Sequence, residues 1–199
     1  MSAKPKGGLE DVVVGDSKTS LVEGTEGRLI YEGYTIEDLA ENATFEDVVY
    51  LLWHERLPNA QELEDLRSQI AAQAVLPDEI IKDLKSYPRD ANPMAVLRTA
   101  VSALAFYDPE GEDLSKDAAR RKAVRVTGQI TTICAAWDRI RKGQEPIAPR
   151  ADLTLAQNFI YMLTGEDPDK TASDAINVYL VLLAEHGMTA STFAARVIT

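Results

Sequence analysis

The spacing of apolar and polar residues changes once along this chain, near residue 34. Before that point, short β-prone runs alternate with glycine-bearing turns, which predicts a small hairpin or meander. The runs are Val12–Val14, Thr19–Val22 and Arg28–Tyr31. After that point, apolar residues recur every three or four positions, the period of an amphipathic helix. The pattern therefore predicts an N-terminal β element over residues 1–34 and a helical portion over residues 35–199.

Capping residues place the starts of several predicted helices. Thr35, Thr44 and Asn59 each stand three positions before an acidic residue and open an apolar stripe, as an N-cap does. Pro77 and Pro93 mark two further starts, because proline fits the first helical turn. The predicted fold class is all-α with a minor β element at the start. Later helices are predicted over Ser115–Lys142, Leu153–Leu163 and Ala172–Glu185, with Gly187 ending the last.

The composition is that of a globular protein with a strong acidic balance. Of the 199 residues, 45% are hydrophobic and 27% are charged, which argues against wholesale disorder. The formal net charge of -11 repels nucleic-acid phosphates and anionic lipids, so neither nucleic acid nor a membrane is an expected partner. Met1–Gly8 has no apolar signal region, and the longest apolar run, Val178–Ala184, is too short to span a bilayer. These features predict a cytoplasmic protein.

Cysteine and basic residues offer little chemistry of their own. Cys134 is the single cysteine, which excludes an intrachain disulfide and a zinc site built from several cysteines. It lies in an apolar helical stretch, where a buried, inert thiol is expected rather than a nucleophile. No metal site is predicted. The densest basic cluster, Arg120–Lys122, either meets a CoA phosphate or pairs with nearby acids, and the second interpretation is favoured.

The two histidines, His54 and His186, are the main candidates for acid–base or ligand chemistry. His54 ends a predicted helix, where the helix dipole favours a protonated imidazole, so a structural or surface role is predicted. His186 follows a strongly apolar helix, and the hydroxyls of Thr189, Ser191 and Thr192 come before the next helix start. An imidazole N–H, hydroxyls and helix N-terminal amides together suit a small carboxylate. The alternative is a histidine that only caps its helix.

Several segments resemble the citrate synthase family, in the same order and at similar spacing over essentially the whole chain. The most specific of them is the segment that contains His186. The resemblance implies that the chain is the N-terminal part of such an enzyme, a portion of its multi-helical large domain. The segments are Gly8–Val13, Gly27–Tyr34, Leu51–Pro58, Asn92–Ser102, Asn158–Gly165 and Ala184–Phe193.

This resemblance implies an activity and an assembly. Members of the family condense oxaloacetate with the acetyl group of acetyl-CoA to form citrate. Acetyl-CoA is a co-substrate, and no bound cofactor is implied. They are helical homodimers with a large and a small domain. The helices predicted around Met94–Tyr107 and Ser115–Lys142 resemble helices of the dimer interface.

The resemblance also assigns roles to two residues. The histidine that matches His186 helps to bind oxaloacetate, and the serine that matches Ser191 supports a catalytic histidine encoded further on. The family's enolising aspartate, two further histidines and substrate-binding arginines fall after Thr199. The reaction needs a base for the acetyl methyl proton and an acid to polarise each carbonyl. One histidine cannot supply all three, so this chain alone is predicted to be inactive.

The sequence departs from the family at four positions around His186. Family members often have His, Asp, Glu and Asn where this chain has Leu183, Glu185, Gly187 and Thr189. Substrate preference therefore stays open, and one alternative is a 2-methylcitrate synthase that uses propionyl-CoA. A second alternative, of another class, is a non-catalytic helical module that serves dimerisation.

Overall fold

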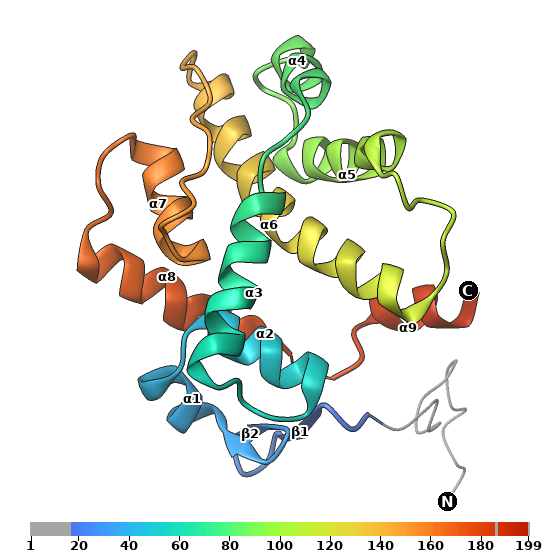
Figure 1. Cartoon of the computed structure of the whole chain (residues 1–199), viewed down its shortest axis with the longest axis vertical. Coiled ribbons are helices and arrows are strands. Elements are labelled where there is room, and N and C mark those ends of the chain that lie inside the picture. Colours follow the sequence, from blue (N-terminus) through green and yellow to red (C-terminus); the bar gives the residue numbers. More distant parts are fainter. Residues whose placement is uncertain (1–16, 186, 199) are drawn as a thin grey trace, which may run out of the picture.

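The computed structural model of the protein describes residues 17–185 and 187–198 (Figure 1). In this part of the chain, a small antiparallel sheet precedes a set of packed helices, which confirms the predicted fold class. The strands are β1 (Ser20–Glu23), β2 (Arg28–Tyr31) and β3 (Tyr34–Thr35). The helices are α1 (Ile36–Asn42), α2 (Phe45–His54), α3 (Ala60–Gln73), α4 (Asp78–Ser86), α5 (Pro93–Ala103), the 3-10 helix η1 (Leu104–Tyr107), α6 (Lys116–Arg141), α7 (Leu155–Thr164), α8 (Lys170–Leu183) and α9 (Ala190–Ile198).

The sheet is a meander in the strand order β1-β2-β3, with Ser20 opposite Tyr31. Glu32 and Gly33 connect β2 to β3, and their φ angles are 45° and 90°. Positive φ at both residues of a two-residue loop matches the twist of the strands that it joins. Residues Tyr34 and Thr35 therefore form the third strand, β3, although the helical portion was predicted to begin at residue 35. The predicted strand Val12–Val14 lies outside the described residues.

The predicted starts of α1, α2 and α3 are confirmed by side-chain caps. Thr44 and Asn59 each form a capping box with the acidic residue three positions on. The Thr35 hydroxyl accepts the Asp38 N–H. Asn92 caps α5 from the position before Pro93, a role that the sequence analysis did not assign to it. Each cap satisfies a backbone N–H that has no partner within the helix, so these starts are set locally.

The ends of α8 differ from the prediction. The helix begins at Lys170 rather than Ala172, because the Asp169 carboxylate caps it and accepts the Ala172 N–H at 2.8 Å. It ends at Leu183 rather than at Glu185 or Gly187. The chain therefore leaves the helix two residues before the predicted end at Glu185.

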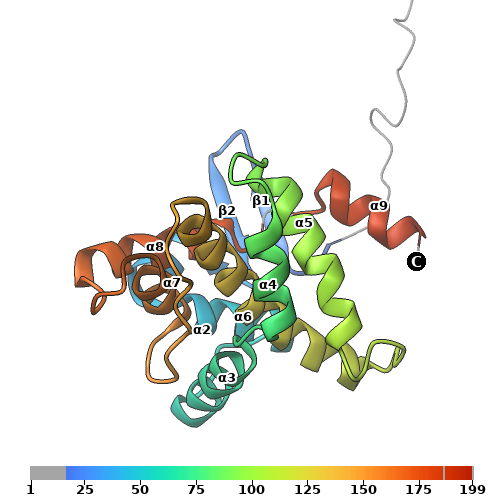
Figure 2. The same cartoon turned by 90° about the horizontal axis from the view of Figure 1, so that it is seen from above.

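Helix α6 lies at the centre of the helical array and contacts α3, α4, α5 and α7 (Figure 1). Seen from above, α7 and α8 lie on one side of the molecule, and α5 and α9 on the other (Figure 2). Helix α6 approaches α3 closely at Gly128. A β-carbon there would lie 2.8 Å from the Ile70 carbonyl oxygen and 3.0 Å from Ala74 Cα. Glycine at this position therefore allows the two backbones to touch.

Buried apolar side chains form three clusters around this centre. One joins α4, α5 and α6, and includes Leu84, Ile133 and Trp137. Another joins α2, α3, α6 and α7, and a third packs Tyr31 and Val181 against α1 and α2. Among the described residues, only α9 of the α-helices buries no side chain. The third cluster connects the sheet to α8, and it thereby positions the chain that follows α8.

We expect Gly128→Ala to destabilise the fold. The added methyl group must displace backbone atoms of α3, and overpacking of this kind costs about 1–3 kcal/mol, partly offset by about 1 kcal/mol of helix propensity. Urea unfolding measures the loss. Gly24→Ala is the control, because a β-carbon at Gly24 meets nothing within 4 Å. Equal stability of the Gly128→Ala and Gly24→Ala variants would contradict the close approach.

Candidate functional site

The buried hydroxyl of Tyr31 holds the chain at the end of α8. This residue ends β2 and is fully buried. Its hydroxyl is 3.3 Å from the Val181 carbonyl oxygen and 3.2 Å from that of Leu182, and it accepts the Glu185 N–H at 3.1 Å. These backbone groups therefore bond to Tyr31 rather than continue the helix, which explains why α8 ends early. Burial raises the pKa of Tyr31, so the hydroxyl keeps its proton.

The carboxylate of Glu185 fixes the turn that follows. Its Oε1 accepts the Gly187 N–H at 2.6 Å and the Ser20 hydroxyl at 3.2 Å. Gly187 has a φ of +87°, a conformation that side chains rarely adopt. Glu185 therefore connects this turn to strand β1. Glu185 has a structural role here, and Gly187 permits the turn.

The predicted hydroxyl cluster is partly assembled. Thr189 caps α9: its Oγ1 accepts the Thr192 N–H at 3.2 Å, and the two hydroxyl oxygens are 3.0 Å apart. The Ser191 side chain is exposed and makes no hydrogen bond with any residue that the structure describes. An unpaired hydroxyl at a helix N-terminus can bind an anion together with the helix amides. The Thr189 and Thr192 hydroxyls thus contact each other, whereas the Ser191 hydroxyl has no hydrogen-bond partner among the described residues.

His186 lies outside the described residues, so its predicted role stays a prediction. Its two neighbours along the chain, Glu185 and Gly187, are described and are hydrogen-bonded to each other. The contributions of Tyr31 and Ser20 to this turn were not predicted. The position of Tyr31 after the apolar pair Leu29 and Ile30 was the only local signal for it, and no local signal pointed to Ser20.

Of the basic cluster on α6, only Arg121 pairs with an acid, the contact favoured for the whole cluster. Arg121 forms an ion pair with Glu110 at 2.5 Å, and Lys122 donates to the carbonyl oxygens of Gly111 and Asp113. These contacts hold the loop between η1 and α6 against the helix. Arg120 makes no hydrogen bond or ion pair within the described residues, and it faces His54 across a surface depression.

His54 stacks on Tyr50, with ring centroids 4.1 Å apart. The structural role is consistent with this contact, but the predicted preference for a protonated imidazole is wrong. Desolvation, then Arg120, then Arg56 lower the pKa of His54 below its usual 6.5. Burial, together with two guanidinium groups, therefore outweighs the favourable helix C-terminus.

Cys134 is partly buried on α6, and burial raises the pKa of its thiol, as expected of an inert cysteine. Within residues 17–185 and 187–198, no three His, Cys, Asp or Glu side chains gather closely enough to hold a metal ion. In the same residues, every helix is too short or too polar to span a lipid bilayer.

Known proteins match this chain along nearly all of its length. A family model described as "Citrate synthase, C-terminal domain" matches residues 8–199. Citrate synthase 2 of Bacillus subtilis is 48% identical over 192 residues, which are 96% of this chain and 51% of that protein. The 2-methylcitrate synthase of Mycobacterium tuberculosis is 40% identical over 194 residues, which are 98% of this chain and 49% of that protein.

Solved structures agree with these relatives. The crystal structure of citrate synthase from Pyrobaculum aerophilum superimposes with a TM-score of 0.90 at 37% identity, covering 96% of this chain and 49% of that one. A citrate synthase from Thermoplasma acidophilum, in a ternary complex with carboxymethyl coenzyme A and oxaloacetate, gives a TM-score of 0.88 at 28% identity. That match covers 97% of this chain and 51% of the other.

Fold and similarity together define a mostly helical protein of the citrate synthase type. The chain belongs to the citrate synthase family. It spans about half the length of the relatives that it matches.

We expect Tyr31→Phe to weaken the turn after α8. The change leaves partly buried backbone groups of Leu182 and Glu185 without their partner, at a cost of about 1–3 kcal/mol. Urea unfolding measures the loss, and amide hydrogen exchange should become faster at residues 184–189. Tyr34→Phe is the matched control, because Tyr34 is exposed and its hydroxyl has no partner in the described chain. Unchanged exchange in Tyr31→Phe would contradict the anchoring role.

We expect Arg120→Ala to raise the pKa of His54 towards 6.5, because it removes the stronger of the two charges that oppose protonation. An NMR titration of the His54 ring proton measures the shift. A lowered folded-state pKa has no effect on stability above pH 6.5 and destabilises the fold as the pH falls through the folded value. The loss of stability at low pH should be smaller in Arg120→Ala than in the control variant, Arg98→Ala. An unshifted His54 titration would contradict the assignment.

Proposed function

We propose that this chain supplies the oxaloacetate-binding part of a citrate synthase-type acyltransferase, with His186 as a substrate ligand and Ser191 as a supporting residue. The carrying observation is the match of residues 8–199 to the citrate synthase family, which includes the segment from Glu185 to Thr192. Support for the substrate comes from the relative solved with oxaloacetate and carboxymethyl coenzyme A.

The turn after α8 has features that suit a dicarboxylate. The N-terminus of α9 carries the partial positive charge of a helix start, and the exposed Ser191 hydroxyl is free to donate. Thr189 and Thr192 already use their hydroxyls to cap α9. Glu185 contributes no positive charge, and its Oε1 is occupied by Gly187 and Ser20. We therefore assign substrate binding to His186 and the amides of α9, a supporting role to Ser191, and the shape of the turn to Glu185.

The complete reaction needs more groups than this segment offers. A base must remove a methyl proton from acetyl-CoA, and acids must polarise the thioester and ketone carbonyls while the new carbon–carbon bond forms. In the proposal, the other half of a full-length subunit supplies the remaining groups. Acetyl-CoA is the proposed co-substrate, since the more similar of the two reported relatives is a citrate synthase.

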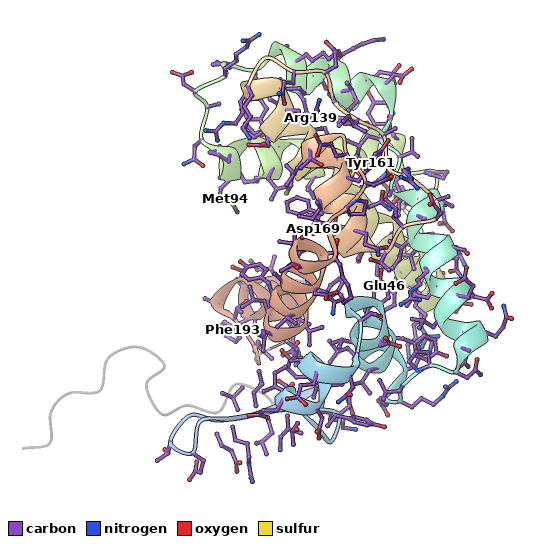
Figure 3. The ribbon with its side chains drawn as sticks, turned by 90° about the vertical axis from the view of Figure 1, so that its left-hand side faces the viewer. Glu46, Met94, Arg139, Tyr161, Asp169 and Phe193 are labelled. Carbon is purple, nitrogen blue, oxygen red and sulfur yellow. The ribbon has the colours of Figure 1, made fainter. Side chains whose placement is uncertain are left out.

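A homodimer is proposed through the face that α5 and α6 form together. Met94 lies at the edge of this face in Figure 3 and is 70% exposed. It borders a depression of about 180 Å³ whose other apolar walls include Leu97, Ile133 and Trp137. An exposed apolar side chain beside a depression with apolar walls favours a protein partner. This observation supports the second candidate function equally, a non-catalytic helical module that only dimerises.

We expect the chain to release thiol from acetyl-CoA with oxaloacetate once it is mixed with the C-terminal half of Bacillus subtilis citrate synthase 2. His186→Ala should reduce the rate about tenfold or more, because a hydrogen bond to a charged substrate is lost. His54→Ala is the control, since His54 stacks on Tyr50 and borders the depression beside Arg120. Sedimentation of the unmixed chain measures its association. A folded, self-associating chain without thiol release in the mixture would refute the catalytic proposal in favour of the dimerisation module.

A further inference from the structure

A buried carboxylate joins α2 to the start of α7. Glu46 lies in the first turn of α2, is labelled in Figure 3, and is only 2% exposed. Its Oε1 accepts the Leu155 N–H at 2.7 Å, which satisfies a free amide at the N-terminus of α7. Its Oε2 is buried and has no hydrogen-bond partner among the described residues. A buried carboxylate oxygen needs a donor, so Glu46 lacks half of its required bonding.

Arg67 on α3 has a buried donor that lacks an acceptor. Arg67 donates from Nη2 to the Thr44 hydroxyl at 3.1 Å, and Thr44 is the N-cap of α2. Its Nε–H is buried and has no acceptor in the described part of the chain. One orphaned acceptor and one orphaned donor therefore belong to oppositely charged groups on neighbouring helices.

Both groups line the same small cavity. It has a volume of about 20 Å³, and its wall also includes Ile70, Thr132 and Asn158. Thr132 donates to the Ala74 carbonyl oxygen, and the Asn158 amide bonds to backbone atoms of the 150–153 loop, so the other polar walls have partners. A cavity of about 10–15 Å³ is large enough for one water molecule, and this cavity is only slightly larger.

We propose that this cavity is a specific site for one water molecule, which bridges Glu46 Oε2 and Arg67 Nε. Water donates and accepts at once, and these two atoms require one bond of each kind. A cation in this position would be repelled by the guanidinium of Arg67. An anion would be repelled by the carboxylate of Glu46. The chemistry of the wall therefore selects a neutral molecule, and the volume limits its size.

The bridge would connect three helices at one point. Glu46 reaches α7 directly through Leu155, and the water extends this contact to Arg67 on α3. Helix α7 packs on α8, whose Asn177 side chain in turn holds the start of α2 by bonds to Phe45 N–H and the Ala43 carbonyl. In this arrangement Glu46 and Arg67 are positioning residues for α7 and α8, and neither acts on substrate.

A high-resolution crystal structure of the chain tests the site directly. We expect one density peak about 2.7–3.2 Å from both Glu46 Oε2 and Arg67 Nε. A direct contact between the two side chains without such a peak would overturn the proposal. A peak with the short, multiple oxygen contacts of a cation would overturn it as well.

A double-mutant cycle with Glu46→Gln and Arg67→Met tests the bridge in solution. If one water serves both groups, the second change costs less once the first is made. If the two changes acted independently, the double variant would alter the unfolding equilibrium constant by the product of the two single effects. We expect the measured effect to be smaller than this product by about threefold or more. Glu46→Gln with Arg98→Met is the control pair, because Arg98 is exposed and has no partner in the described residues. Effects of Glu46→Gln and Arg67→Met that multiply as the control pair does would overturn the bridge.

Discussion

The close approach of α3 and α6 at Gly128 is the constraint on which the helical array depends. Because no side chain separates the two backbones there, α6 can pack against α3 and still contact α4, α5 and α7 with its other faces. The same contact brings Ile70 and Ala74 to the wall of the cavity beside Glu46 and Arg67. A larger residue at position 128 would separate these elements and open the centre of the fold.

Polar contacts connect this centre to the candidate site and hold the elements around the site in place. Asn177 and Glu46 fix α2 against α8 and α7, and Tyr31 fixes the sheet against the end of α8. The turn at Glu185 is therefore held from two directions, by the helices and by the strands. This supported turn is where a citrate synthase-type enzyme would need precise geometry, because the proposed ligand, His186, comes next in the chain.

Much of the fold followed from local signals in the sequence. Thr44 and Asn59 cap helices through bonds to residues three positions away, so their neighbours alone identify them. The candidate site was less accessible. Tyr31 and Ser20 form hydrogen bonds with Glu185, which is more than 150 residues away in the sequence, and no neighbouring residue indicates these contacts. His54 shows the same limit, because Arg120, distant in the chain, contributes to the direction of its pKa shift.

The sequence by itself determined the fold class, the order of the helices, the capped starts of α1, α2 and α3, and the resemblance to the citrate synthase family. The first three depend on periodicity and on caps, which act over a few residues, and the resemblance depends on the order of motifs along the chain. Only the tertiary structure decided where α8 ends, which acids the basic cluster meets, and how Glu46 and Arg67 come to line one cavity. Each of these depends on burial, which removes water from polar groups and forces them to find partners from distant parts of the chain.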